Sequence, residues 1–202
     1  QVAQVQPMKL AAMEALYNGG KGESLTAIAA VHPFQQPDYE SEQEPAMRIA
    51  IPNMLSFLAT RTADGYVPGV NDIIKGYTKE DGTREPSVQE KIARGKKAIV
   101  ALKTYRETKA QDQLPILREN MKYFGYGYIK DAKELVPSIP ICFYAFRLMV
   151  GVGCLLILFF ALSLFLVYKK EIAQYRWFLI SAIIMIPLAY IASESGWIVA
   201  EI

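Results

Sequence analysis

Arg147 and Met149 are the two residues of this sequence whose types and spacing point most clearly to chemistry. They lie near the start of an almost uninterrupted apolar run, Ile139 to Tyr168. An arginine at the mouth of a membrane helix is costly unless it has an anionic partner. The methionine two residues further on offers a thioether, which is a soft ligand of the kind that binds haem iron. The pair predicts a membrane protein built around a redox-active group rather than a simple anchor.

Each of these residues also has an ordinary interpretation. A methionine in an apolar helix is usually a core residue, and an arginine near a helix end can extend its charged head to the membrane interface. Glu194 lies one to two turns inside a second apolar run, and an intramembrane carboxylate suggests function. Two further residues of the same run have ordinary interpretations. In these, Glu201 is a charge that just reaches water, and Trp197 belongs to the interfacial aromatic belt.

The composition divides the chain into two unlike parts. The 202 residues are 52% hydrophobic and carry a formal charge of +2, which is too small to indicate nucleic-acid binding. Residues 1–137 hold 18 of the 22 Lys and Arg and 17 of the 20 Asp and Glu. The first part therefore reads as water-exposed and residues 138–202 as membrane-embedded. Because the sequence opens with neither an initiator Met nor a signal peptide, we expect an internal piece of a longer protein.

Two membrane spans are predicted, at residues 138–168 and 177–202, with Pro187 as a tolerated kink in the second. The loop between them, residues 169–176, is short and basic, so the positive-inside rule predicts that it is cytoplasmic. Residues 1–137 would then be extracytoplasmic. The expected fold is an all-α membrane protein, a fragment of a multi-span helical bundle with a large, partly helical extracytoplasmic loop.

Within the polar segment, three helices are expected. The first covers Pro7 to Tyr17, with proline in its first turn. The second covers Ser87 to Lys109 and begins with a Ser87–Glu90 capping box, although Gly95 weakens it. The third covers Gln113 to Tyr123 and should end before Gly125 and Gly127. Ile49 to Thr60 is expected as a short helix and residues 18–46 as loop. Cys142 and Cys154 lie about 18 Å apart along one helix and cannot bridge each other.

Three blocks of sequence, taken together and in order, resemble subunit I of the cytochrome bd quinol oxidases. They are QPMKLAAMEALY (Gln6 to Tyr17), FYAFRLMVGVG (Phe143 to Gly153) and ESGWIVAE (Glu194 to Glu201). Weaker matches lie at Ile51 to Arg61 and Phe124 to Lys130. The resemblance covers nearly all of the chain and is closest to the long-loop type. It implies that this piece is the quinol-binding loop plus the two following membrane helices.

The resemblance also implies roles for particular residues. Lys9 and Glu14 would form the quinol-oxidation site, although five residues on a helix do not share a face and two solvated charges are the ordinary alternative. Met149 would be the axial ligand of a low-spin haem b and Arg147 the partner of a haem propionate. Glu201 would ligate the iron of a second, high-spin haem b, with Glu194 and Trp197 in a haem-supporting or proton-path role.

The second ligand of the Met149 haem is expected from outside this chain. His32 is the single histidine and is interpreted as an ordinary loop residue. The isolated 202 residues are therefore expected neither to bind haem nor to be active.

The function implied is that of a respiratory terminal oxidase in the prokaryotic cytoplasmic (inner) membrane. It would oxidise quinol at the outer face and pass electrons through two haems b to a haem d site that reduces O2 to water. A proton gradient would arise without pumping. The expected partners are a second membrane subunit, with small accessory subunits as an option, and the lipid bilayer. The alternative is a two-span membrane protein whose extracytoplasmic domain binds a ligand or partner without redox chemistry.

Overall fold

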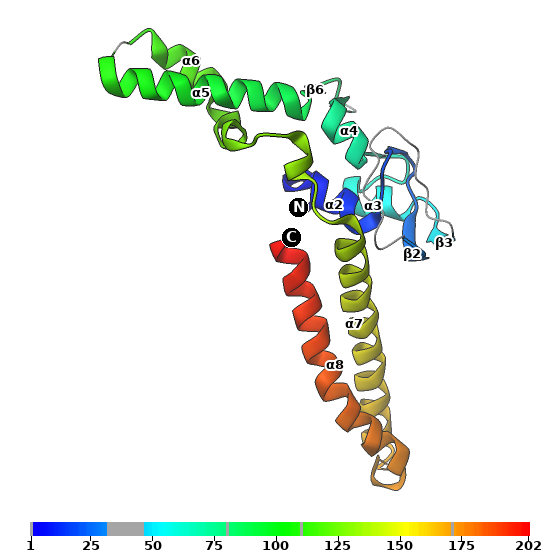
Figure 1. Ribbon diagram of the computed structural model, residues 1–202. Coiled ribbons are helices and arrows are strands. Elements are labelled where there is room, and N and C mark those ends of the chain that lie inside the picture. The colour runs from blue at the N-terminus through cyan, green and yellow to red at the C-terminus, as the bar shows by residue number, and fades with distance from the viewer. Residues whose placement is uncertain (1, 32–46, 80, 110, 171) are drawn as a thin grey trace. The chain divides into compact units, whose positions relative to one another are not determined.

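The computed structural model describes residues 2–31, 47–79, 81–109, 111–170 and 172–202. These form two compact units, residues 1–139 and 140–202. Each unit is described by itself, and both can be followed along the chain in Figure 1. His32 and most of the expected loop 18–46 lie outside the described residues.

The first unit opens with helices and three very small sheets. The elements in its first half are α1 (Val2–Val5), α2 (Pro7–Glu14), β1 (Gly20–Lys21), β2 (Leu25–Ala29), β3 (Arg48–Ile51), α3 (Met54–Thr60), β4 (Tyr66–Val67), α4 (Val70–Lys75), β5 (Tyr77–Thr78) and β6 (Arg84–Glu85). The strands pair antiparallel as β1 with β4, β2 with β3 and β5 with β6. The segment is thus partly helical, as expected, with short strands that the sequence analysis did not predict, and helix predominates along the described chain.

The antiparallel pair of β2 and β3 replaces part of the loop and part of the short helix that the sequence predicted. The two strands contain the β-branched residues Thr26, Ile28, Ile49 and Ile51, and the register pairs Ile28 with Ile49. Such side chains favour strands because they pack well on a pleated surface. Ile51 also precedes a proline, which disfavours the helical conformation at that position. The helix consequently begins only at Met54.

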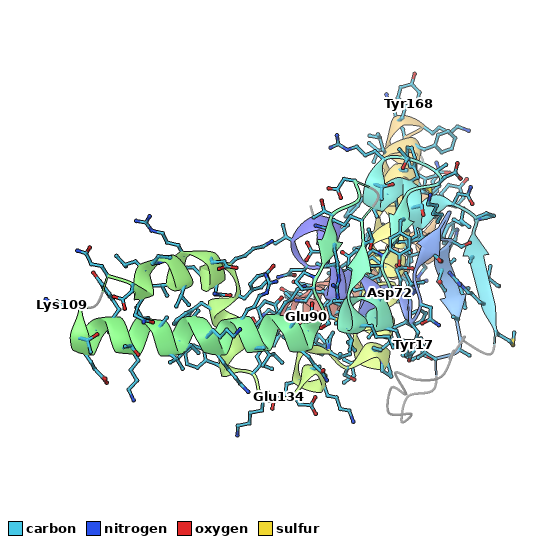
Figure 2. The ribbon with its side chains drawn as sticks, turned by 90° about the horizontal axis from the view of Figure 1, so that it is seen from above. Tyr17, Asp72, Glu90, Lys109, Glu134 and Tyr168 are labelled. Carbon is cyan, nitrogen blue, oxygen red and sulfur yellow. The ribbon has the colours of Figure 1, made fainter. Side chains whose placement is uncertain are left out.

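The second half of this unit is a helical arm. It consists of α5 (Val88–Thr108), α6 (Gln113–Asn120) and two 3₁₀ helices, η1 (Met121–Tyr128) and η2 (Ala132–Leu135). The expected capping box is confirmed, because Glu90 N donates to Ser87 Oγ and Ser87 N donates to the Glu90 carboxylate. Figure 2 shows Glu90 and Lys109 at opposite ends of α5. The helix after Gln113 does not stop before Gly125, since it tightens into η1 and runs through both glycines.

Among the described residues, two small clusters of buried side chains help to hold the first unit together. Leu16, Leu55 and Val67 form one, with Leu10, Leu25 and Ala59 packed around them. The other cluster lies at the start of α5 and consists of Val88, Ile92 and Ala132.

The second unit is a pair of long apolar helices, α7 (Ile139–Tyr168) and α8 (Arg176–Glu201), joined through η3 (Ile172–Gln174). Both are long and apolar enough to cross a membrane. They run antiparallel, as Figure 1 shows, and the rings of Phe159 and Phe178 stack with centroids 4.7 Å apart near the connection. Pro187 lies inside α8 without interrupting it. Cys142 and Cys154 are both free, as expected from their separation.

Candidate functional site

The helix α2 carries both polar residues that the resemblance assigns to quinol oxidation. Pro7 stands in its first turn, where a missing N–H costs nothing. Its C-terminal half is buried, including Met13, and Leu16, just after the helix, is buried as well. Lys9 is half-buried, whereas only 4% of Glu14 is exposed. Helical geometry puts the two on different faces, so α2 alone does not bring them together.

Glu14 has a defined hydrogen-bond donor in a neighbouring strand. The backbone N–H of Thr26, in β2, donates to Glu14 Oε2 at 3.2 Å. Thr26 is itself 4% exposed, and its hydroxyl accepts a hydrogen bond of 2.9 Å from Arg48 Nε in β3. Burying a carboxylate is costly unless donors surround it, so this contact fixes where Glu14 can lie.

The start of α4 fixes the chain that follows α2. The backbone N–H groups of Val70 and Asn71 donate to the carbonyls of Leu16 and Tyr17, each at 2.9 Å. Asp72 adds a clamp, because its Oδ2 accepts from Gly19 N at 2.6 Å and from Gly69 N at 2.9 Å. Tyr17 and Asp72 are both labelled in Figure 2. The first N–H groups of α4 are thus paired with carbonyls of the chain just after α2. These bonds fix the position of α2 within this unit.

A cavity of about 710 Å³ opens beside α2, with Pro7 and Leu10 in its wall. Its polar lining includes Tyr66, Tyr77 and Glu85. Burial, together with the adjacent Asp72 carboxylate, raises the pKa of Tyr66 to about 12, so its hydroxyl remains a hydrogen-bond donor at neutral pH. The sequence analysis did not single out these residues, which come from segments far apart in the chain.

The polar end of this cavity is an ion-pair network around Glu85. Lys79 Nζ lies 2.6 Å from Glu85 Oε1, and Lys91 Nζ lies 3.5 Å from Oε2. Burial alone would raise the pKa of Glu85. The hydrogen bond from Lys79 and the positive charge of Lys91 outweigh burial and hold that pKa below its ordinary value. The network therefore ties β5 and β6 to the first turn of α5.

In the second unit, Arg147 and Met149 lie on nearly opposite sides of α7, because residues two positions apart in an α-helix differ by about 200° around its axis. The Arg147 guanidinium lies 3.9 Å from the ring centroid of Phe143, one turn toward the N-terminal end of α7. Both interpretations of Arg147, a propionate partner and an interfacial anchor, require the guanidinium to point to this end.

Met149 faces the neighbouring helix. A Cβ added to Gly196 of α8 would lie 3.0 Å from Met149 Sδ, so the thioether occupies the space that a larger residue would fill. Gly153 follows one turn after Met149 on the same side of α7. A Cβ there would meet no atom of the described residues within 4 Å. The space beside Gly153 is therefore open among the described residues.

Glu194, Trp197 and Glu201 share one face of α8, since they are spaced by three and four residues. All three are exposed in this unit, whereas Ser195 and Val199 on another face are buried. This stripe is turned away from the side of Gly196 that meets Met149. Among the described residues, no group of three His, Cys, Asp or Glu side chains could hold a metal ion.

These features are those of a helical membrane protein with a large polar segment and carboxylates within an apolar helix. A sequence model of the family described as cytochrome bd terminal oxidase subunit I matches residues 1–202. The chain belongs to this family, which confirms the resemblance drawn from the three sequence blocks.

Two relatives illustrate the similarity. The chain is 31% identical, over an alignment of 208 residues, to the cytochrome bd-II ubiquinol oxidase subunit 1 of Escherichia coli. It is 26% identical over 198 residues to the cytochrome bd ubiquinol oxidase subunit 1 of Bacillus subtilis. The alignments cover 100% and 98% of this chain but only 39% and 30% of the two relatives, so the chain spans well under half of their lengths.

Proposed function

We propose that the chain is the quinol-binding loop and the two following membrane helices of a respiratory quinol oxidase in the prokaryotic cytoplasmic membrane. The observation that carries the proposal is the family match, which runs over residues 1–202 and so includes all three sequence blocks. The E. coli relative, matched along 100% of this chain, is named a ubiquinol oxidase subunit. A non-redox binding domain would not account for that match.

In quinol oxidation, Lys9 and Glu14 have different roles. Oxidation of a quinol to a quinone releases two protons and two electrons. Lys9, which is half-buried, donates a hydrogen bond to a quinol oxygen. Glu14 accepts a proton, and the hydrogen bond that its buried carboxylate accepts from Thr26 N helps to hold that carboxylate in one orientation. Residues 1–137 stand on the extracytoplasmic side, so these protons leave there.

The residues of α7 fit one side of a haem. Met149 supplies a soft thioether donor, and the open space at Gly153 leaves room for a flat macrocycle beside it. Arg147, turned toward the N-terminal end of α7, pairs with a propionate. When bound, the two haems b and the haem d of this family would carry electrons from quinol to the place where O2 is reduced to water. A second protein ligand for the haem that Met149 would hold would come from outside this chain.

The carboxylates of α8 serve the far end of the electron path. Glu201 would hold the iron of the high-spin haem b, and Trp197, one turn before it, would pack on the macrocycle. Glu194 lies two turns before Glu201 on the same face, about 10 Å away along the axis, and would hold or pass a proton. If the protons used in making water come from the cytoplasm, the reaction charges the membrane without a pump.

The full protein would require partners beyond this chain. The outward surfaces of α7 and α8 expose large apolar side chains, including Phe160, Leu164 and Ile183. Such surfaces suit lipid, the other helices of the subunit and the second membrane subunit.

The test is a reduced-minus-oxidised absorption spectrum of the full-length parent protein in membranes, with wild type beside Met149→Leu. We expect the low-spin haem b signal to be lost or to become high-spin, while the haem d signal persists. Met185→Leu is the matched control, because Met185 is also half-buried in a membrane-length helix, α8. That variant should leave the spectrum unchanged.

Two other outcomes have distinct meanings. A parent protein without haem would refute the oxidase function. Haem that is present but unaffected by Met149→Leu would leave the oxidase function standing and overturn the assignment of Met149 as ligand.

A further inference from the structure

The carboxylate of Glu14 is oriented by a strand that the proposed function does not itself require. Its hydrogen bond comes from the backbone N–H of Thr26, twelve residues further along the chain. The position of that N–H depends on how β2 is held, and not on α2. Whatever fixes Thr26 therefore also fixes the direction from which Glu14 can receive a proton.

Arg48, in the neighbouring strand, donates two hydrogen bonds to this segment, one to Thr26 and one to Ser24. Its Nε donates to Thr26 Oγ1 and its Nη2 donates to the backbone carbonyl of Ser24, both at 2.9 Å. The guanidinium thus spans Ser24 to Thr26 in the fork geometry that arginine offers and lysine does not. Because both donors belong to one rigid plane, the segment from Ser24 to Thr26 cannot shift without breaking one of the bonds.

The ladder itself is irregular at this point. Thr26 pairs with Ala50 and Ile28 with Ile49, so the register shifts between Thr26 and Ile28. A bulge of this kind leaves a residue unpaired and bends the strand, and bulges often re-aim groups next to functional sites. Thr26 stands at the edge of this irregularity, where the contact with Arg48 adds a side-chain tie between the two strands.

We propose that Thr26 and Arg48 are positioning residues for Glu14, and that they set the rate at which Glu14 takes a proton from quinol. This inference rests on the proposed function, in which Glu14 is the proton acceptor. Neither residue touches the quinol in this role. Proton transfer needs donor and acceptor within hydrogen-bond reach, so a carboxylate released from its orientation reacts more slowly even when quinol binds as before.

The experiment compares steady-state quinol oxidation by the full-length oxidase carrying Thr26→Val, Thr26→Ser or Arg48→Gln. Thr26→Val keeps the shape and the backbone N–H but removes the oxygen that Arg48 binds. Thr26→Ser keeps that oxygen. Arg61→Gln is the matched control, because Arg61 is an exposed arginine at the end of the nearby helix α3. Haem spectra recorded on each sample report whether the complex has assembled.

We expect Thr26→Val and Arg48→Gln to lower kcat by about tenfold to a hundredfold, the scale of a misplaced catalytic group. KM for quinol should change by less than about twofold, because the contacts that bind the ring remain. Thr26→Ser should keep most of the wild-type kcat, and Arg61→Gln all of it. A merely structural role would lower assembly or raise KM instead, and would not be rescued by serine.

Glu14→Gln in the same series separates the two levels of the proposal. If that variant oxidises quinol normally, the proposed role of Glu14 fails and the positioning role fails with it. If Glu14→Gln is inactive while Thr26→Val and Arg48→Gln keep wild-type kcat, only the positioning role is overturned. The same holds if Arg48→Gln behaves like Arg61→Gln, or if Thr26→Ser is as slow as Thr26→Val.

Discussion

Gly95 of α5 and Gly127 of η1 bring their backbones into direct contact. A Cβ built on Gly95 would lie 2.4 Å from Gly127 N, and one built on Gly127 would lie 2.6 Å from the carbonyl carbon of Gly95. Any side chain at either position would overlap main-chain atoms, which cannot turn away as a flexible side chain can. The two glycines therefore set how closely the helices of the arm approach.

Gly95→Ala should consequently loosen the arm. Alanine would favour the α5 helix by up to about 1 kcal/mol, but overpacking of a close contact costs about 1–3 kcal/mol. Because the overlap is with backbone, we expect the loss to exceed the gain. Hydrogen exchange of residues 88–128 in the full-length oxidase should become faster.

Gly125→Ala is the control for this prediction. It lies in the same 3₁₀ helix as Gly127, but a Cβ there would meet no described atom within 4 Å. Exchange in this variant should match the wild type. Equal protection in Gly95→Ala would mean that the helices do not need this close approach.

The capping box supplies a second prediction. Ser87→Ala removes the hydroxyl that accepts from Glu90 N, and loss of such a cap typically costs about 1 kcal/mol. The first turn of α5 should exchange faster, while the turn around Lys103 should not. Ser87→Asp keeps an acceptor at the same position and should restore protection. An alanine variant as protected as the wild type would show that tertiary packing alone holds this helix end.

Helix α5 shows what sequence reasoning could recover. The start of α5 depends on Ser87 and Glu90, a local pattern that is visible in the sequence and was predicted. Its packing depends on Gly95 and on Gly127, which are thirty-two residues apart. Each glycine taken alone signals a helix that weakens or stops. Their contact reverses that meaning, and no local pattern reveals a contact at such a separation.

The candidate site shows the same division. Lys9, Glu14 and Met149 became candidates because the family resemblance supplies their context, while the ordinary roles remained open from the residues alone. Thr26 and Arg48 could not be found in this way, because they reach Glu14 through strand pairing. The β-branched residues of Leu25–Ala29 and Arg48–Ile51 were the available signal for a hairpin, but glycine, proline and polar residues nearby favoured a loop.

Glu85 provides a prediction about pH. Its pKa is held below the ordinary value of 4.5 by Lys79 and Lys91 despite burial. A carboxylate with a depressed pKa contributes stability above its unfolded-state pKa, and this contribution is lost as pH falls through the folded-state value. Glu85→Gln should therefore speed hydrogen exchange of residues 77–92 near neutral pH, once the intrinsic pH dependence of exchange is removed.

The same comparison at lower pH completes that test. As the pH falls from 4.5 through the lowered folded-state pKa of Glu85, the wild type should progressively lose its advantage over Glu85→Gln, because its carboxylate is then protonated and no longer charged. The exposed Glu107, near the other end of α5, serves as the matched control, and Glu107→Gln should resemble the wild type at both pH values. A difference between wild type and Glu85→Gln that persists unchanged in acid would rule out the ion pairs as its source.

Gly196→Ala tests the position of the Met149 thioether without removing it. The added Cβ would lie 3.0 Å from Met149 Sδ, so the sulfur must move by a few tenths of an ångström. A methionine side chain is flexible, so the full-length oxidase should still assemble.

If the sulfur is an axial ligand, even a small displacement changes its bond to iron, and the midpoint potential of the low-spin haem b should shift in a redox titration. If Met149 only fills space between α7 and α8, the potential should stay at the wild-type value. A double variant decides whether the effect passes through the sulfur, because in a Met149→Leu background Gly196→Ala should add no further shift to the absorption spectrum of the haem that remains. An additional shift in that background would show that Gly196 acts on the haem by another route.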